Sequence, residues 1–153
     1  HNCAAVHFIE ADNSSYLCSN RKDSTYIYMK NIAETYWKRK KMPIPHLLLS
    51  DYEGRNVWSH KGIVHWRGMN ICMVTDGYWR NKSATNLLDI DYMYLCKGYK
   101  GEIAPLQKLF HIKRIVLDAS LGDYKLKAYK EECKTLGLDY IDISEKGSFR
   151  ILL

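Results

Sequence analysis

Long hydrophobic runs are missing from this sequence. No stretch reaches the roughly 18 consecutive apolar residues of a membrane span, so we expect the chain itself to be soluble. Internal repeats, low-complexity tracts and linkers are missing too, and 153 residues suit one domain with a real core. The chain begins at His1 without a methionine, and the alternation of apolar and polar residues starts almost at once, so we expect no signal peptide within these residues. We therefore expect a single domain over residues 1–153, excised from a longer protein.

Short metal-binding motifs are absent as well. The six histidines include no HxH, HxxxH or HExxH spacing, and the five cysteines form no CxxC pair. His60 and His65 flank a predicted Lys61-Gly62 turn and could approach each other across a hairpin. Ordinary histidines on a strand surface are the simpler interpretation, so we expect no metal and no cofactor.

The cysteines are odd in number and lie mostly inside apolar runs, which predicts buried free thiols. If Asp12-Asn13 is the turn of an opening hairpin, the register places Cys18 opposite His7. That register excludes a bridge between Cys3 and Cys18. A Cys18–His7 nucleophile pair is formally possible, but neither a third orienting group nor a loop-mounted thiol accompanies it.

Basic residues outnumber acidic ones, with 23 Lys and Arg against 17 Asp and Glu. This excess suits a polyanion, but it is also common in proteins that bind none. The run Lys38, Arg39, Lys40 and Lys41 follows Tyr36-Trp37, and such a cluster could grip single-stranded nucleic acid. Alternatively, the aromatic residues face the core and the basic ones complement the helix dipole. A later predicted helix has a second basic face that we interpret as solvated: Lys125, Lys127, Lys130 and Lys134.

The first half of the chain predicts a hairpin, a helix and a meander. Strands over residues 3–10 and 14–19 flank a polar turn. An apolar face repeating at four-residue steps predicts a helix over 24–41, which Pro43 and Pro45 end. After this helix the apolar residues recur at about every second position. This pattern predicts antiparallel strands at 46–50, 56–60, 62–66 and 69–75.

From Asp91 onward strands and helices alternate, which favours crossover connections covering a sheet. The predicted helix over 123–136 has a buried stripe of apolar residues, and Gly137 ends this helix with a Schellman-type C-terminal cap. The sequence therefore predicts the α/β class, with a mixed sheet and helices. We expect strands at 92–96, 114–119, 140–143 and 148–152, helices at 103–110 and 123–136, and a turn at 145–147.

This element order resembles the metallo-β-lactamase-like domain at the C-terminus of ComEC-type channels for DNA uptake. Residues 94–101 (YLCKGYKG) are similar to the family strand that enters a double-histidine turn. Residues 114–120 (RIVLDAS) are similar to its next strand, and 144–149 (SEKGSF) to its closing turn and strand. The resemblance spans nearly the whole chain and implies a truncated αββα sandwich of the shortened ComEC subgroup.

In active members of that family, an HxHxDH segment, an aspartate and later histidines hold two metal ions. By this resemblance, no segment of the present sequence corresponds to HxHxDH. Lys97-Gly98 occupies the position where the family has its double histidine. Gly122-Asp123-Tyr124 stands where a further histidine is expected, and Asp76 alone matches the metal-bridging aspartate. One carboxylate cannot build a dinuclear site, so the resemblance implies no metal and no hydrolysis by that mechanism.

A remnant of that site is still expected around Asp76. Lys97, Tyr99 and Lys100 follow a strand, where loops of α/β sheets gather ligand-binding groups, and Asp123 follows the next strand. Our hypothesis is an ion pair between Lys97 and Asp76 that fills the vacated metal site. The alternative is that both side chains point to solvent independently.

The resemblance implies a non-catalytic accessory domain of a natural-competence channel, acting in assembly or in contact with DNA or partner proteins. Its implied partners are the parent transmembrane channel and single-stranded DNA, with no small-molecule substrate. It also implies membrane association through the parent chain, on the periplasmic or external face. Two alternatives stay open: an active hydrolase or nuclease with an unrecognised site, and a purely structural interaction domain.

Overall fold

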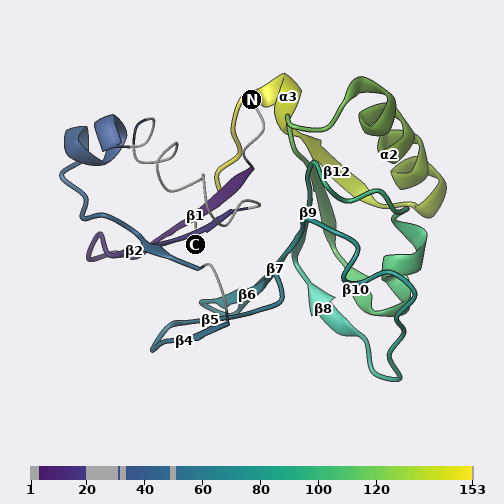
Figure 1. The fold of residues 1–153 in the computed structure, drawn as a ribbon, viewed down its shortest axis with the longest axis horizontal. Helices are drawn as coiled ribbons and strands as arrows, with labels where there is room; N and C mark the ends of the chain where they lie inside the picture. Colours follow the sequence, from purple (N-terminus) through teal and green to yellow (C-terminus); the bar gives the residue numbers. More distant parts are fainter. Residues whose placement is uncertain (1–3, 20–30, 32–33, 49–50, 153) are drawn as a thin grey trace.

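The computed structural model describes residues 4–19, 31, 34–48 and 51–152, drawn as a ribbon in Figure 1. Its largest feature is a seven-stranded sheet with the strand order β12-β11-β9-β7-β6-β5-β4. These strands are β4 (Tyr52–Glu53), β5 (Val57–His60), β6 (Ile63–Trp66), β7 (Met69–Val74), β9 (Tyr92–Leu95), β11 (Arg114–Leu117) and β12 (Asp139–Asp142).

The seven-stranded sheet is mixed. Strands β7, β9, β11 and β12 run parallel, whereas β4, β5, β6 and β7 form an antiparallel meander. Helix α2 (Asp123–Leu136) links β11 to β12 with the predicted bounds. It ends at Gly137, whose φ of 69° is the left-handed conformation of a C-terminal cap. The predicted α/β class is confirmed.

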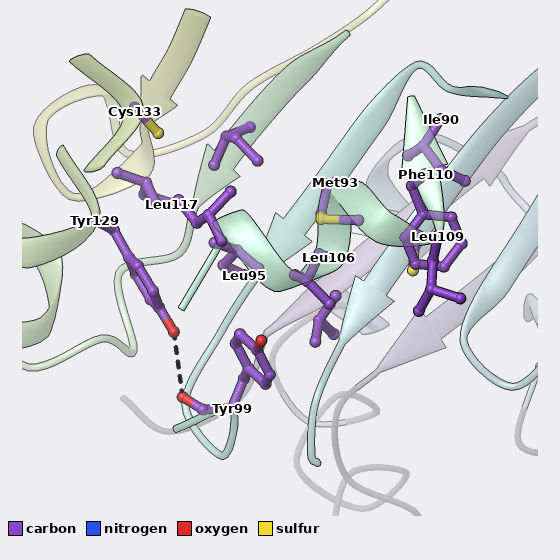
Figure 2. Close-up of a cluster of buried hydrophobic side chains, with 14 of the residues drawn as sticks. Ile90, Met93, Leu95, Tyr99, Leu106, Leu109, Phe110, Leu117, Tyr129 and Cys133 are labelled. Carbon is purple, nitrogen blue, oxygen red and sulfur yellow. Dashed lines mark hydrogen bonds between the residues drawn. The ribbon is translucent and has the colours of Figure 1, made fainter. Parts of the chain in front are cut away.

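Both faces of the parallel strands are buried, because apolar side chains alternate between two cores. One core lies under α2 and contains Val74, Met93, Leu95 and Leu117. Figure 2 shows Met93, Leu95 and Leu117 in this core. The neighbouring residues of the same strands enter the other core: Met73, Tyr94, Cys96 and Val116.

A smaller sheet covers the face of the main sheet opposite α2 (Figure 1). It has the strand order β1-β2-β3 and consists of β1 (Ala5–Ile9), β2 (Ser15–Ser19) and β3 (His46–Leu47). The Phe8 ring meets the Trp66 ring edge-on at 5.4 Å between centroids. The meander prediction at residues 46–50 is therefore corrected in part, since residues 46–47 pair with β2 and not with the next strand along the chain; residues 49–50 lie outside the described residues.

The register of the opening hairpin differs from the prediction. Glu10 N–H donates to the Ser14 carbonyl at 2.9 Å, so the loop has one residue more than a two-residue turn. Cys18 consequently lies opposite Val6, and His7 lies opposite Leu17. The prediction that Cys18 faces His7 is therefore wrong, while Cys18 itself is a buried free thiol as expected.

The predicted helix at 103–110 is also corrected. Residues Ala104–Lys108 form a single short 3₁₀ helix, η1, with Pro105 in its first turn. Chain direction then changes, and β10 (Phe110–Ile112) pairs in parallel with β8 (Leu88–Ile90). This pairing of distant segments overrides the local helical pattern.

The C-terminal prediction is wrong in two places. Residues Ile143–Lys146 form a helical turn, α3, because the Asp142 side chain accepts the Ser144 N–H as an N-cap. Residues 148–152 are not a strand. Instead, the Phe149 ring packs against Tyr92 with centroids 5.8 Å apart, so this segment covers the sheet through side chains.

The predicted helix at 24–41 lies mostly outside the described residues. Its described end is helical at 34–39 and stops before Pro43. In Figure 1 this helical end lies beside β2, on the opposite side of the molecule from α2.

Candidate functional site

The parallel strands end together at one edge of the main sheet, which we call the carboxyl edge. Val74 pairs with Leu95, Leu95 with Leu117, and Leu117 with Asp142, so the segments following these residues start side by side. Open α/β sheets bind ligands at this kind of edge. The carboxyl edge consists of residues 75–77, 96–98, 118–120 and 142–144.

Asp118 is the carboxylate at the centre of this edge and is only 6% exposed. Its Oδ2 accepts a 2.5 Å hydrogen bond from the Tyr94 hydroxyl, and its Oδ1 accepts the Ser120 N–H at 2.8 Å. Ser120 Oγ in turn accepts the Lys97 N–H at 3.1 Å. Asp118 therefore ties the ends of β9 and β11 together.

Asp142 is the second buried carboxylate of the edge, at 4% exposure. Its Oδ2 lies 2.5 Å from Lys130 Nζ of α2, and its Oδ1 accepts the Ser144 N–H at 2.8 Å. Burial by itself would raise the pKa of Asp142, but hydrogen bonds from Lys130 and Ser144 hold it below its usual range. The pKa of Lys130 is raised by the same bond and by Glu145. Lys130 is thus an ion-pair partner, which corrects its assignment to a simply solvated face.

The edge brings the segments of Asp76 and Lys97 together. A Cβ on Gly98 would lie 2.2 Å from the Thr75 carbonyl oxygen, so residues 97–98 abut residues 75–76. Both Asp76 and Lys97 are exposed, and Asp76 Oδ1 accepts the Tyr78 N–H at 2.8 Å. The Lys97–Asp76 ion pair itself stays a prediction.

The other predicted remnant residues lie in different environments. Tyr99 is buried under α2, where burial raises the pKa of its hydroxyl. Its carbonyl oxygen accepts the Tyr129 hydroxyl, the bond dashed in Figure 2, and its own hydroxyl donates to the Glu102 carbonyl at 2.7 Å. Lys100 is exposed in the same loop, and Asp123 is exposed at the first residue of α2. Tyr99 therefore holds its loop against the helix.

The basic run of the first helix lies away from the carboxyl edge. Lys38, Arg39, Lys40 and Lys41 are all exposed, and Lys38 Nζ lies 2.8 Å from Glu34. Trp37 is 5% exposed and packs near the His7 ring, so the prediction that this aromatic residue faces the core is confirmed. Phosphate contact there would depend on the cations alone.

The histidines are engaged with neighbouring polar side chains. His60 Nδ1 lies 2.7 Å from Asp51, and His65 Nδ1 lies 2.7 Å from the Asn70 side-chain oxygen. His65 pairs across the hairpin with Trp58, whereas His60 pairs with Ile63. Within the described ranges, histidine, cysteine and acidic side chains nowhere gather in threes that could hold a metal ion.

Sequence reasoning missed both buried carboxylates. Each is an aspartate at the end of an apolar strand, Ile115-Val116-Leu117-Asp118 and Tyr140-Ile141-Asp142. That shared pattern was the available signal, because carboxylates in such positions enter the carboxyl edge of a parallel sheet.

Comparison with known proteins identifies the family. The sequence profile of the ComEC C-terminal domain matches residues 1–153. Searches of curated proteins and of solved structures give no significant match. Across the described part of the chain, every helix is too short or too polar to span a bilayer. Because the profile covers every residue, the chain belongs to the ComEC C-terminal domain family, which connects it to a membrane channel for DNA uptake.

Proposed function

We propose that this domain is a non-catalytic accessory part of the channel that contacts incoming single-stranded DNA. The non-catalytic part of the proposal rests on the two buried carboxylates at the carboxyl edge, which are both engaged by groups of the protein itself. All four oxygens of Asp118 and Asp142 already meet protein donors or the Lys130 ammonium.

A metal ion needs carboxylate oxygens that it can reach and whose charge is not already balanced by a cation. Asp118 is only 6% exposed and accepts a hydrogen bond at each oxygen, and Asp142 is already paired with the Lys130 ammonium. A metal ion at Asp142 would therefore have to displace Lys130 or lie beside a like charge. Lys97 adds an ammonium at the same edge, and a cation of this kind disfavours a second cation nearby.

The DNA-contacting part of the proposal rests on charge. The formal net charge is +6, and the exposed run of Lys38, Arg39, Lys40 and Lys41 presents cations toward solvent. Cations that neutralise phosphates release counterions, which drives binding at low salt. A position on the periplasmic or external face, where the DNA strand arrives, completes the proposal.

Nuclease activity is the first test. The 153-residue chain is incubated with single-stranded DNA and with Mg²⁺, Mn²⁺ or Zn²⁺, beside an Asp76→Asn variant. We expect no cleavage by either protein, and no change of melting temperature when EDTA is added. Metal-dependent cleavage that Asp76→Asn abolishes would establish the hydrolase alternative instead.

DNA binding is the second test. Fluorescence anisotropy of a labelled oligothymidylate should show binding that weakens steeply as salt rises, and Lys38→Glu/Lys40→Glu should reduce it. Failure of the unchanged protein to bind at low salt would favour the purely structural domain.

A further inference from the structure

A second basic surface surrounds Tyr78, which follows Asp76 at the end of β7. The Tyr78 side chain is 40% exposed, although tyrosine is a large aromatic residue. Lys82 Nζ lies 4.3 Å and Lys61 Nζ 5.4 Å from the centroid of its ring. Lys82, four residues further along the chain, and Lys61, from a separate turn, therefore place two ammonium groups around one exposed ring. We call the side chains of Tyr78, Lys61 and Lys82 the Tyr78 surface.

The ring is held firmly in place. The Tyr78 N–H donates to Asp76, and the ring meets the Trp79 ring edge-on at 4.7 Å between centroids. Trp79 in turn packs against the buried Phe110 ring at 5.2 Å. An aromatic side chain fixed before binding loses little conformational entropy when a partner contacts it.

Lys61 is positioned from the other side by the turn between β5 and β6. Gly62 accepts the Met73 N–H at 2.8 Å, and a Cβ on Gly62 would lie 2.6 Å from the Met73 carbonyl oxygen. The turn therefore lies tightly against the end of β7, which keeps Lys61 close to Tyr78.

The charge of this surface is only partly balanced. Asp76 is directed to the Tyr78 backbone, while Asp51 pairs with His60 and accepts the Lys61 N–H at 3.4 Å. Among the described side chains, no carboxylate lies within 4.0 Å of either Lys61 Nζ or Lys82 Nζ. A cation over a tyrosine ring gains about 0.5–1 kcal/mol at an exposed site, and an anion between the two ammoniums would relieve their repulsion.

We propose that the Tyr78 surface binds the phosphodiester backbone of single-stranded DNA, with the tyrosine contacting a sugar or base. This inference rests on the proposed function and adds a second contact region to it. Paired cations beside an exposed aromatic side chain are the combination that sequence-independent binding of single strands uses. A cation-only surface would attract any polyanion, whereas the ring favours unstacked nucleotides.

The location supports a separate contact region. The segment between β7 and β8 lies on the β8–β10 side of the molecule in Figure 1, away from the helical end at 34–39 beside β2. The two basic regions are therefore distinct surfaces, and variants of one leave the other intact.

The test is anisotropy with a fluorescein-labelled oligothymidylate and the 153-residue chain. Lys61→Glu/Lys82→Glu should weaken binding at least about tenfold. It should also reduce the slope of log K against log salt concentration by about 1.4, which is about 0.7 for each of two lost phosphate contacts. Lys127→Glu/Lys134→Glu on the exposed face of α2 changes the net charge equally and should leave affinity within about twofold of the unchanged protein. Equal weakening by both double variants would overturn the inference, because net charge alone would then explain it.

Tyrosine variants test the aromatic contact without a change of charge. Tyr78→Ala should weaken binding severalfold, whereas Tyr78→Phe keeps the ring and should bind like the unchanged protein. Unchanged melting temperatures verify folding. If Lys61→Glu/Lys82→Glu binds normally while Lys38→Glu/Lys40→Glu does not, the Tyr78 surface is excluded and the proposed DNA contact stands. If the unchanged protein fails to bind at low salt, both proposals fail.

Discussion

The Tyr94 hydroxyl and the Asp118 carboxylate form a 2.5 Å hydrogen bond across the neighbouring strands β9 and β11. Both residues are buried, and Tyr94 pairs in register with Val116, two residues before Asp118. The bond therefore spans the diagonal between two parallel strands at the point where both end. It fixes the carboxyl edge from inside the protein.

Removing this hydroxyl should destabilise the fold. Tyr94→Phe keeps the ring but leaves Asp118 Oδ2 without its buried donor, at a cost of about 1–3 kcal/mol. Urea unfolding followed by circular dichroism measures the change. Tyr92→Phe, which alters a half-buried tyrosine packed on Phe149, should change stability by less than about 0.5 kcal/mol. Equal losses in the two variants would contradict a specific role for the Tyr94–Asp118 bond.

Gly98 should be the least replaceable glycine at the carboxyl edge. Its φ of 116° is unfavourable for other residues, and a Cβ would lie 2.2 Å from the Thr75 carbonyl oxygen. Gly98→Ala should therefore cost at least about 2 kcal/mol of unfolding free energy. Gly77→Ala is the matched control, because its Cβ would meet only the Arg80 side chain, at 3.4 Å from Cδ and 3.9 Å from Cγ, which are ordinary contacts. A Gly98→Ala protein as stable as the control would show that the two segments separate easily.

The sequence predicts elements best where the signal is local. The stripe of α2 and the cap at Gly137 define that helix completely, and the apolar runs of β9 and β11 identify both strands within two residues. The hairpin register failed because one additional loop residue shifts every pair. The strand at Phe110 was missed because its partner, Leu88, is distant in the chain.

The candidate site was predictable only in part for the same reason. Asp76 and Lys97 follow parallel strands, so strand order alone brings their segments together. The Tyr94–Asp118 bond requires the pairing of β9 with β11, and the approach of Lys61 to Tyr78 requires the turn before β6 to lie against β7. No spacing in the sequence expresses such contacts.

Asp142 should make stability depend on acid pH. Its pKa is lowered in the folded state, so its stabilising contribution is complete above the unfolded pKa of about 4 and is lost as pH falls through the folded value. Asp142→Asn removes the charge at every pH. The stability gap between the two proteins, measured by urea midpoints, should therefore be widest near pH 7 and narrow below about pH 4.

The control for this prediction is Asp139→Asn at the exposed start of β12, which should give a small gap at every pH. This control measures the effect of a carboxylate-to-amide change on the same strand at a position outside the Lys130 ion pair. A gap that stayed constant down to acid pH would mean that the Lys130 pair does not depend on the charge of Asp142.

The buried thiols should be unreactive in the folded protein. Burial raises the pKa of Cys72 to about 12 and that of Cys18 and Cys133 to about 11, so at pH 8 only about one thiol in a thousand or fewer is thiolate. In a Cys3→Ser background, which removes the one cysteine outside the described residues, DTNB should react negligibly over minutes. Denaturant should release all four described thiols, the fourth being Cys96. Cys18 lies between the small sheet β1-β2-β3 and the main sheet. If one thiol of the folded protein reacts rapidly with DTNB and Cys18→Ser abolishes this reaction, the small sheet opens readily from the main sheet.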